Sequence, residues 1–218
     1  YILAALFFFM IYYFFVAYVL ISPLLHRFPH FLGTASPLTL LLGPLVYFYV
    51  RVHLDRLPRF RLRDGLHFLP YLLNIGSFIP FYLLPGEEKV LEFLNLVQGT
   101  PSTGLSVALM LYSFSPIVYA LWSITVLTEH RDDLKHLFSY TTEKMEVDWM
   151  WYLSWTMFAV AVIAFLINGI IVFSDVADWI QLRYVIITVV VVWTFALGYY
   201  GVRRTSFFNT FPVDPANT

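Results

Sequence analysis

Four uncharged polar residues within apolar segments are the strongest candidates for a functional site. Tyr71 and Asn74 share one apolar segment, Ser113 lies in a second and Asn168 in a third. In a membrane, such side chains usually join helices through close packing and interhelical hydrogen bonds. Alternatively, the four converge on a pocket for a small molecule, in which a few polar groups fix the orientation of the ligand. The sequence leaves both interpretations open, and neither requires a catalytic group.

Other combinations of reactive residues have simpler interpretations. His26 and His30 have the spacing of a metal-binding pair, but Pro29 disturbs a helix between them and no carboxylate is near in the sequence. Adjacent acidic residues on a helix do not face one another, so they make poor acid–base partners. No phosphate-binding loop, nucleophile elbow or metalloprotease motif occurs, and the chain has no cysteine. We therefore expect a protein that is not an enzyme and binds no metal or cofactor.

The composition indicates a membrane protein. Of the 218 residues, 60% are hydrophobic, 20% are aromatic and only 12% are charged, whereas charged residues make up about a quarter of an average soluble domain. The net charge of -1 gives no indication of nucleic-acid binding by this chain. We therefore expect the lipid bilayer to be the main partner of the fold.

Six segments free of Asp, Glu, Lys, Arg and His are long enough for transmembrane helices, which need about 20 apolar residues. The fourth is too long for one span, and its Gly99–Gly104 cluster predicts that the spanning helix begins near Thr103. The prediction is an all-α, polytopic transmembrane helix bundle with six visible spans: Tyr1–Leu25, Phe31–Val50, Phe68–Gly86, Phe93–Thr128, Trp149–Ser174 and Tyr184–Val202.

The positions of lysine and arginine predict the orientation, because cytoplasmic loops carry the excess of both. If the six segments alternate in direction, all of the 13 basic residues except Arg27, Lys89 and Arg183 fall on one side. That side is predicted to be cytoplasmic and to hold the C-terminus, with the rings of Tyr47 and Tyr49 at head-group level. The main anchors of this orientation are Arg51, Arg56, Arg59, Arg61, Arg63, Arg203 and Arg204.

An amphipathic helix is predicted on the opposite side of the membrane, at residues 86–98. Val90, Leu91, Leu94 and Val97 recur at helical spacing, opposite acidic residues and Asn95. Such a helix either covers the bundle as a surface element or caps a pocket.

Three motifs are similar to those of a known family. They are GPLVYFYVR at 43–51, HFLP at 67–70 and GYYGVR at 198–203. Together with Phe28–Pro29, they resemble the N-terminal multi-helix membrane region of bacterial AraC-type transcription regulators that are integral to the cytoplasmic (inner) membrane. The resemblance covers nearly the whole chain.

This resemblance implies a sensor domain. The full-length protein would have seven spans, one of them before Tyr1, with a sensor bundle at 1–204 and a linker at 205–218 that leads to a cytoplasmic helix-turn-helix domain absent from this chain. That domain alone would bind DNA, and the bundle would respond to an unidentified small-molecule or lipid ligand.

Paired helix-turn-helix units read paired half-sites, so the resemblance also implies a homodimer. Gly198 and Gly201 would allow close approach of another helix, from the same protomer or from its partner. The alternative function is a transporter or channel subunit. The absence of charged residues near the midpoints of the spans argues against it.

Overall fold

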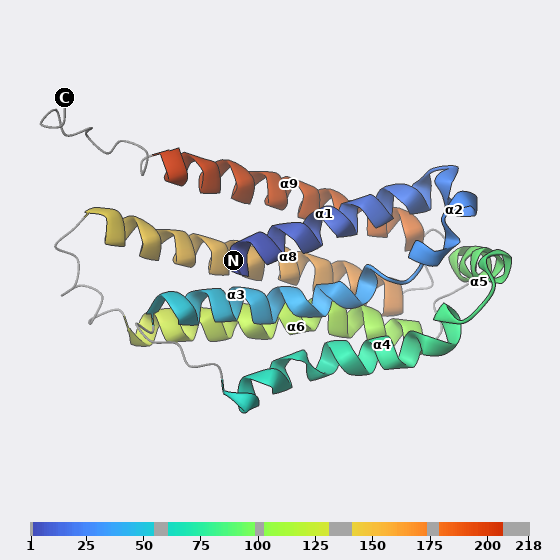
Figure 1. The fold of residues 1–218 in the computed structure, drawn as a ribbon, viewed down its shortest axis with the longest axis horizontal. Helices are drawn as coiled ribbons and strands as arrows, with labels where there is room; N and C mark the ends of the chain where they lie inside the picture. The colour runs from blue at the N-terminus through green and yellow to red at the C-terminus, as the bar shows by residue number, and fades with distance from the viewer. Residues whose placement is uncertain (1, 55–60, 99–102, 131–140, 174–178, 207–218) are drawn as a thin grey trace, which may run out of the picture.

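The computed structural model describes residues 2–54, 61–98, 103–130, 141–173 and 179–206, and these form a bundle of roughly aligned helices (Figure 1). The long helices are α1 (Ile2–Ile21), α3 (Thr39–Leu54), α4 (Leu69–Tyr82), α5 (Gly86–Gln98), α6 (Thr103–Glu129), α8 (Thr141–Phe173) and α9 (Trp179–Ser206). Short elements connect them: α2 (Leu24–Arg27) and the 3-10 turns η1 (Pro29–Phe31), η2 (Ser36–Leu38) and η3 (Leu62–Phe68).

The described part of the chain is all-helical, as predicted, and five of its helical segments are long and apolar enough to cross a membrane, which is compatible with a polytopic bundle. They correspond to α1, η1 to α3, α6, α8 and α9. The predicted start of the fourth span near Thr103 is also confirmed, since α6 begins at that residue. The 33 residues of α8 amount to about 50 Å of helix, more than the roughly 30 Å of a hydrocarbon core, so α8 must extend beyond it.

The third predicted span, Phe68–Gly86, is the exception. Its α-helix α4 has only 14 residues, and Leu62–Tyr82 passes as a span only together with Gly86–Asn95, from which it is bent by 112°. The count is therefore five, or six if this bent pair is one span. Proline contributes to the short length, because Pro80 lies near the end of α4 and cannot donate a backbone hydrogen bond.

Helix α5 matches the predicted amphipathic segment in its bounds. Val90 is buried, and with Phe93 it packs against Leu25 and Leu32. Leu91 and Leu94 are exposed on the surface of the protein, and the Val97 side chain lies outside the described residues. The helix therefore covers one end of the bundle through Val90 and Phe93.

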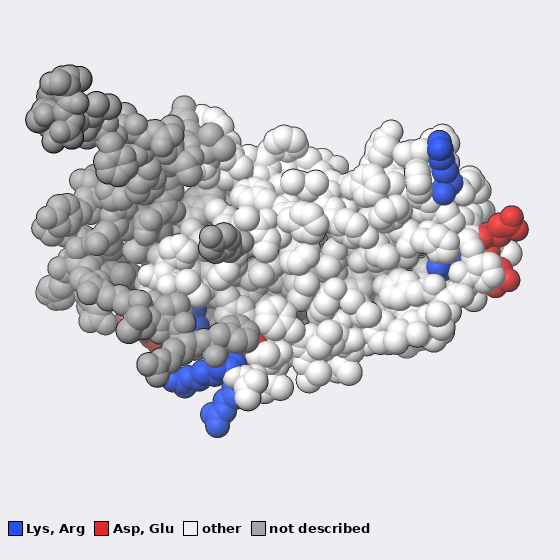
Figure 2. Space-filling model, in the orientation of Figure 1, with Lys and Arg blue, Asp and Glu red and all other residues white. Residues whose placement is uncertain are grey.

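Charged side chains lie toward the two ends of the molecule, and an uncharged belt separates them on the face in view (Figure 2). Arg51 lies in the last turn of α3, and Arg61 and Arg63 lie at η3. The opposite end carries Arg27 in α2 and Lys89 in α5 (Figure 1). Of the other predicted anchors, Arg56 and Arg59 lie outside the described residues, as do the side chains of Arg203 and Arg204 on α9. Helix α9 runs on to Ser206, past the predicted start of the linker, and the rest of that linker also lies outside them.

Tyr47 and Tyr49 do not face the head groups as expected. Both are buried, and the Tyr47 ring lies 4.7 Å from the Trp122 ring and 5.5 Å from the His67 ring, between centroids. Beside them, Arg51 donates to Asp64 at 2.7 Å, so this anchor also connects α3 to η3.

The main core lies where α1, α3, α6, α8 and α9 meet. Helices α3 and α6 come so close that a Cβ atom on Gly43 would lie 2.6 Å from Cδ2 and 2.9 Å from Cβ of Tyr119. Only glycine fits there, because real Cβ contacts of this length do not occur without backbone movement.

Replacing Gly43 by alanine should therefore destabilise the bundle, by about 1–3 kcal/mol, as overpacked cores do. The matched control is Gly76→Ala on α4, where a Cβ would meet nothing within 4 Å, so its stability should be unchanged or slightly higher. Reversible unfolding by sodium dodecyl sulfate in mixed micelles would measure both. Equal stabilities of the two variants would contradict the close α3–α6 contact.

Candidate functional site

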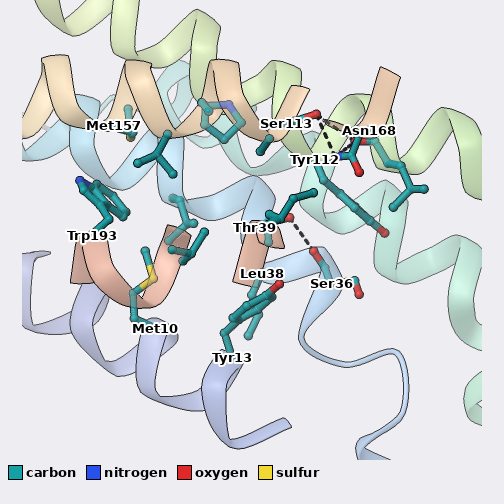
Figure 3. A pocket seen from close by; sticks show the side chains of 18 of the residues that line it. Met10, Tyr13, Ser36, Leu38, Thr39, Tyr112, Ser113, Met157, Asn168 and Trp193 are labelled. Atoms are coloured by element: carbon teal, nitrogen blue, oxygen red, sulfur yellow. Dashed lines mark hydrogen bonds between the residues drawn. The ribbon is translucent and has the colours of Figure 1, made fainter. Parts of the chain in front are cut away.

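A cavity of about 100 Å³ lies inside the bundle. Its walls come from α1, η2 with the start of α3, α6, α8 and α9 (Figure 3). The walls are mostly aliphatic or aromatic, with Pro116 of α6 among them. A cavity of this kind between helices is the usual form of a small-molecule site in a helical bundle.

The cavity has an apolar end and a polar end. Met10, Met157 and Trp193 gather toward one end, whereas Tyr112, Ser113 and Asn168 lie toward the other (Figure 3). The Trp193 indole N–H is already bonded, since Nε1 donates to Thr156 Oγ1 at 3.0 Å. Met10, Met157 and Trp193 therefore offer a ligand contact area only, whereas hydrogen-bonding groups come from the polar end and from Tyr13, Ser36 and Thr39.

Ser113 and Asn168, two of the four predicted site residues, lie together in this cavity wall. Asn168 Nδ2 donates to the Leu109 carbonyl oxygen at 3.2 Å and to Ser113 Oγ at 3.3 Å. The Ser113 hydroxyl donates in turn to the Leu109 carbonyl oxygen at 3.1 Å. These contacts fix which end of the amide is nitrogen, because a flipped Asn168 would place oxygen against the Leu109 carbonyl oxygen.

The remaining amide atom of Asn168 has no partner. Asn168 is only 4% exposed, and its Oδ1 lacks a hydrogen bond within the described residues. A buried amide oxygen normally accepts at least one hydrogen bond, so an unpaired one at a cavity wall is a position for a ligand donor or a bound water.

Tyr71 and Asn74 do not line the cavity. Asn74 Oδ1 accepts a hydrogen bond from the Tyr112 hydroxyl at 3.1 Å, which connects α4 to α6. Tyr71 packs against the small cluster that contains Leu109 and Tyr112. The four predicted residues are thus divided: two line the cavity, one supports a lining residue from behind, and one is part of the packing around it.

Arg183 is the cationic group of the cavity wall. It is half-buried on α9, and no ion pair joins it to another described residue. Asp175 and Asp178, the nearest carboxylates in sequence, lie outside the described residues. Within the described ranges, no group of three His, Cys, Asp or Glu side chains could hold a metal ion. The half-buried Arg183 and the unpaired Asn168 Oδ1 in one cavity lining suit the binding and orienting of a ligand.

Sequence reasoning missed Tyr112 and Arg183 as site residues. Tyr112 lies four residues from Ala108 and one from Ser113, on the α6 face that is buried, so helical spacing was an available signal. The sequence placed Arg183 only among the three basic residues that fall on the side opposite the predicted cytoplasmic side. No pattern in the sequence indicates that it turns toward the bundle interior.

A second polar cluster lies at the α5 end of the bundle. Lys89 is 2% exposed, and its Nζ donates to His30 Nδ1 and to the Tyr82 carbonyl oxygen, both at 2.9 Å. His30 therefore accepts a hydrogen bond as a neutral imidazole rather than acting with His26 as a metal pair. The cluster connects α5 to η1 and to the end of α4.

The polar end of the cavity predicts unequal losses of stability for two substitutions of Asn168. Asn168→Leu removes one donor and the unpaired oxygen together, and interhelical hydrogen bonds average only about 0.6 kcal/mol, so the unfolding free energy should fall by about 1 kcal/mol or less. Asn168→Asp adds a second acceptor or a charge next to the Leu109 carbonyl and should cost about 3 kcal/mol. Unfolding by sodium dodecyl sulfate checks both. An aspartate variant as stable as the leucine variant would show that the described hydrogen bonds do not form.

Comparisons of the chain with models of protein families, with curated proteins and with solved structures give no match. The similarity to AraC-type membrane regulators therefore depends on the sequence motifs alone.

Proposed function

We propose that the bundle is a membrane-embedded sensor, in which a ligand occupies the cavity and alters the position of α9. The observation that carries this proposal is the make-up of the cavity wall, to which α9 contributes Arg183, Ile186, Val190 and Trp193. A ligand that binds one position of α9 better than another shifts the population toward it. Since α9 is the last helix described, its movement would pass directly to the segment that follows.

The motifs that resemble AraC-type regulators support a specific output. In this proposal, the chain is the sensor half of a bacterial transcription regulator of the cytoplasmic membrane, and a cytoplasmic helix-turn-helix domain follows its linker. DNA binding belongs to that domain. A transporter or channel remains the alternative function, but no observation on the described residues favours it over a sensor.

An open surface on α9 supports a homodimer. A Cβ atom on Gly198 or Gly201 would meet no described atom within 4 Å, so neither glycine is used for close packing inside the protomer. Small residues on a lipid-facing surface allow another helix to approach closely. The proposed partner is α9 of a second copy, placed so that paired output domains could read paired half-sites.

Spin-label distances between α6 and α9 test the sensor proposal. The chain has no cysteine, so Glu129→Cys and Gly201→Cys provide the only labelling sites, and Gly201 has open space for a label. In nanodiscs, the distance distribution should shift when a bacterial membrane lipid extract replaces synthetic phosphatidylcholine. A Gly201→Cys single label should report a short distance between protomers if the dimer forms.

Two phenylalanine substitutions on α8 form a matched control. Ala164 lines the cavity, so Ala164→Phe should fill it and abolish the shift. Ala159 lies exposed on the same helix, and Ala159→Phe should leave the shift intact. A shift that survives Ala164→Phe, or one that both variants lose, would reject the cavity as the sensing site. Uptake of a membrane-impermeant dye into proteoliposomes but not into protein-free liposomes, without any α6–α9 shift, would favour a transporter.

The proposed orientation predicts opposite labelling of two exposed positions. Arg63 lies at η3 and Glu88 on α5, at the two ends of the bundle. In intact cells, a membrane-impermeant maleimide should label Glu88→Cys, whereas Arg63→Cys should react only after permeabilisation, because the basic end is cytoplasmic. The reverse pattern would show that the Glu88 end is cytoplasmic. Labelling of both positions in intact cells would contradict a topology in which the two ends lie on opposite sides of the membrane.

A further inference from the structure

The shape of the cavity restricts its occupant to a slim molecule. Arg183 and Trp193 both line it and are ten residues apart on α9, a separation of about 15 Å along the helix axis. With a volume of about 100 Å³ over that length, the cavity accommodates a single extended chain better than a bulky ring system.

The two ends of the cavity require different chemistry. The Met10, Met157 and Trp193 end is apolar, which suits an alkyl chain. However, an alkyl chain gains little by leaving lipid for this end, because lipid tails are as apolar as the side chains. Discrimination between ligands must therefore come from the polar end.

Among the polar groups of the lining, which also include the hydroxyls of Tyr13, Ser36 and Tyr112, Arg183 supplies a cation and Asn168 an unpaired acceptor. Arg183 has five N–H donors and a permanent charge, and it matches a carboxylate or phosphate. It is the third residue of the Gln181–Gly201 span, which is near the depth at which an amphiphile in a bilayer holds its head group. Asn168 Oδ1, buried and unpaired, needs a hydroxyl or N–H donor from the ligand.

We propose that the cavity binds a single-chain acyl amphiphile with an anionic head group and a neighbouring hydrogen-bond donor, such as a hydroxy fatty acid. This assignment rests on the proposed sensor function and specifies its ligand class. The anionic group pairs with Arg183, the donor bonds to Asn168 Oδ1, and the chain extends along α9 toward Trp193.

The ligand could be a free amphiphile or one chain of an anionic phospholipid with a hydroxylated head group, because both present the same chemistry. Titrations in phosphatidylcholine nanodiscs with and without phosphatidylglycerol separate these sources. Competition between phosphatidylglycerol and the added acid identifies a membrane lipid as the occupant, and its absence identifies a free amphiphile.

The test uses a series of three probes on the purified chain in phosphatidylcholine nanodiscs, with affinities measured by calorimetry. 3-Hydroxydodecanoate should bind roughly tenfold more tightly than its methyl ester, which lacks the charge, and about threefold or more tightly than dodecanoate, which lacks the donor. Arg183→Gln should remove the preference for acid over ester, and Arg183→Lys should retain part of it. Asn168→Leu should remove only the preference for the hydroxyl.

Several outcomes overturn the assignment. Equal binding of acid and ester, or an unchanged preference in Arg183→Gln, means that Arg183 does not bind the head group. An unchanged hydroxyl preference in Asn168→Leu rejects Oδ1 as the acceptor. Melting temperatures in the same nanodiscs distinguish a lost contact from misfolding, with Arg183→Lys as the second variant.

The sensor proposal and the ligand assignment can fail separately. If 3-hydroxydodecanoate binds with the expected preferences and the Glu129→Cys to Gly201→Cys distance does not change, the ligand class is correct and the sensor function is not. If a lipid extract shifts that distance while none of the three probes binds, the ligand class is wrong and the sensor function is retained.

Discussion

The close contacts of α6 with its two neighbours determine the arrangement of the whole bundle. Helices in lipid satisfy their backbone groups internally and gain little from burying apolar surface, so close packing and a few hydrogen bonds hold them together. On one side, Gly43 lets α3 approach Tyr119 of α6. On the other, Asn168 of α8 donates to the Leu109 carbonyl of α6. These two contacts set the spacing against which α1 and α9 then pack.

The cavity follows from uneven packing along α6. One buried cluster contains Ala120 and Leu127, nearer the C-terminal end of α6, and another contains Ala108, Leu109 and Tyr112, nearer its start. Pro116 lies between them and lines the cavity. Because proline has no N–H and its ring disturbs the preceding turn, the two clusters do not merge at this level. The space that remains is bounded on one side by α9, which contributes the positively charged Arg183 to the lining.

The sequence predicted the helical class and most element positions, because each span leaves a long apolar run. It also gave the bounds of α5 and the start of α6. It was less successful where tertiary contacts override local patterns: Tyr47 and Tyr49 suit head-group level in isolation, but Tyr47 packs inside against Trp122 and His67, and Tyr49 lies in the main core. Of the polar residues, Ser113 and Asn168 share the cavity, whereas the sequence could not show that Asn74 faces Tyr112 instead, because helix rotation depends on packing partners.

A comparison of two unpaired oxygens distinguishes an imperfectly satisfied core from a binding site. Ser154 Oγ and Asn168 Oδ1 are the buried side-chain atoms that lack a partner in the described part of the chain. Ser154 does not line the cavity, and leaving its small hydroxyl unpaired costs stability without creating access for a ligand. The unpaired Asn168 Oδ1 also costs stability, but Asn168 lines the cavity, and Arg183 lines the same cavity. A bundle selected for packing alone would need neither an unpaired oxygen at position 168 nor a cation on this face of α9, since within the described residues neither the Asn168 Oδ1 atom nor the Arg183 charge makes a hydrogen bond or ion pair between helices, whereas Asn168 Nδ2 does. Violations of packing rules that coincide at one cavity are typical of functional sites, and this coincidence, rather than either polar group alone, gives the cavity its functional interpretation.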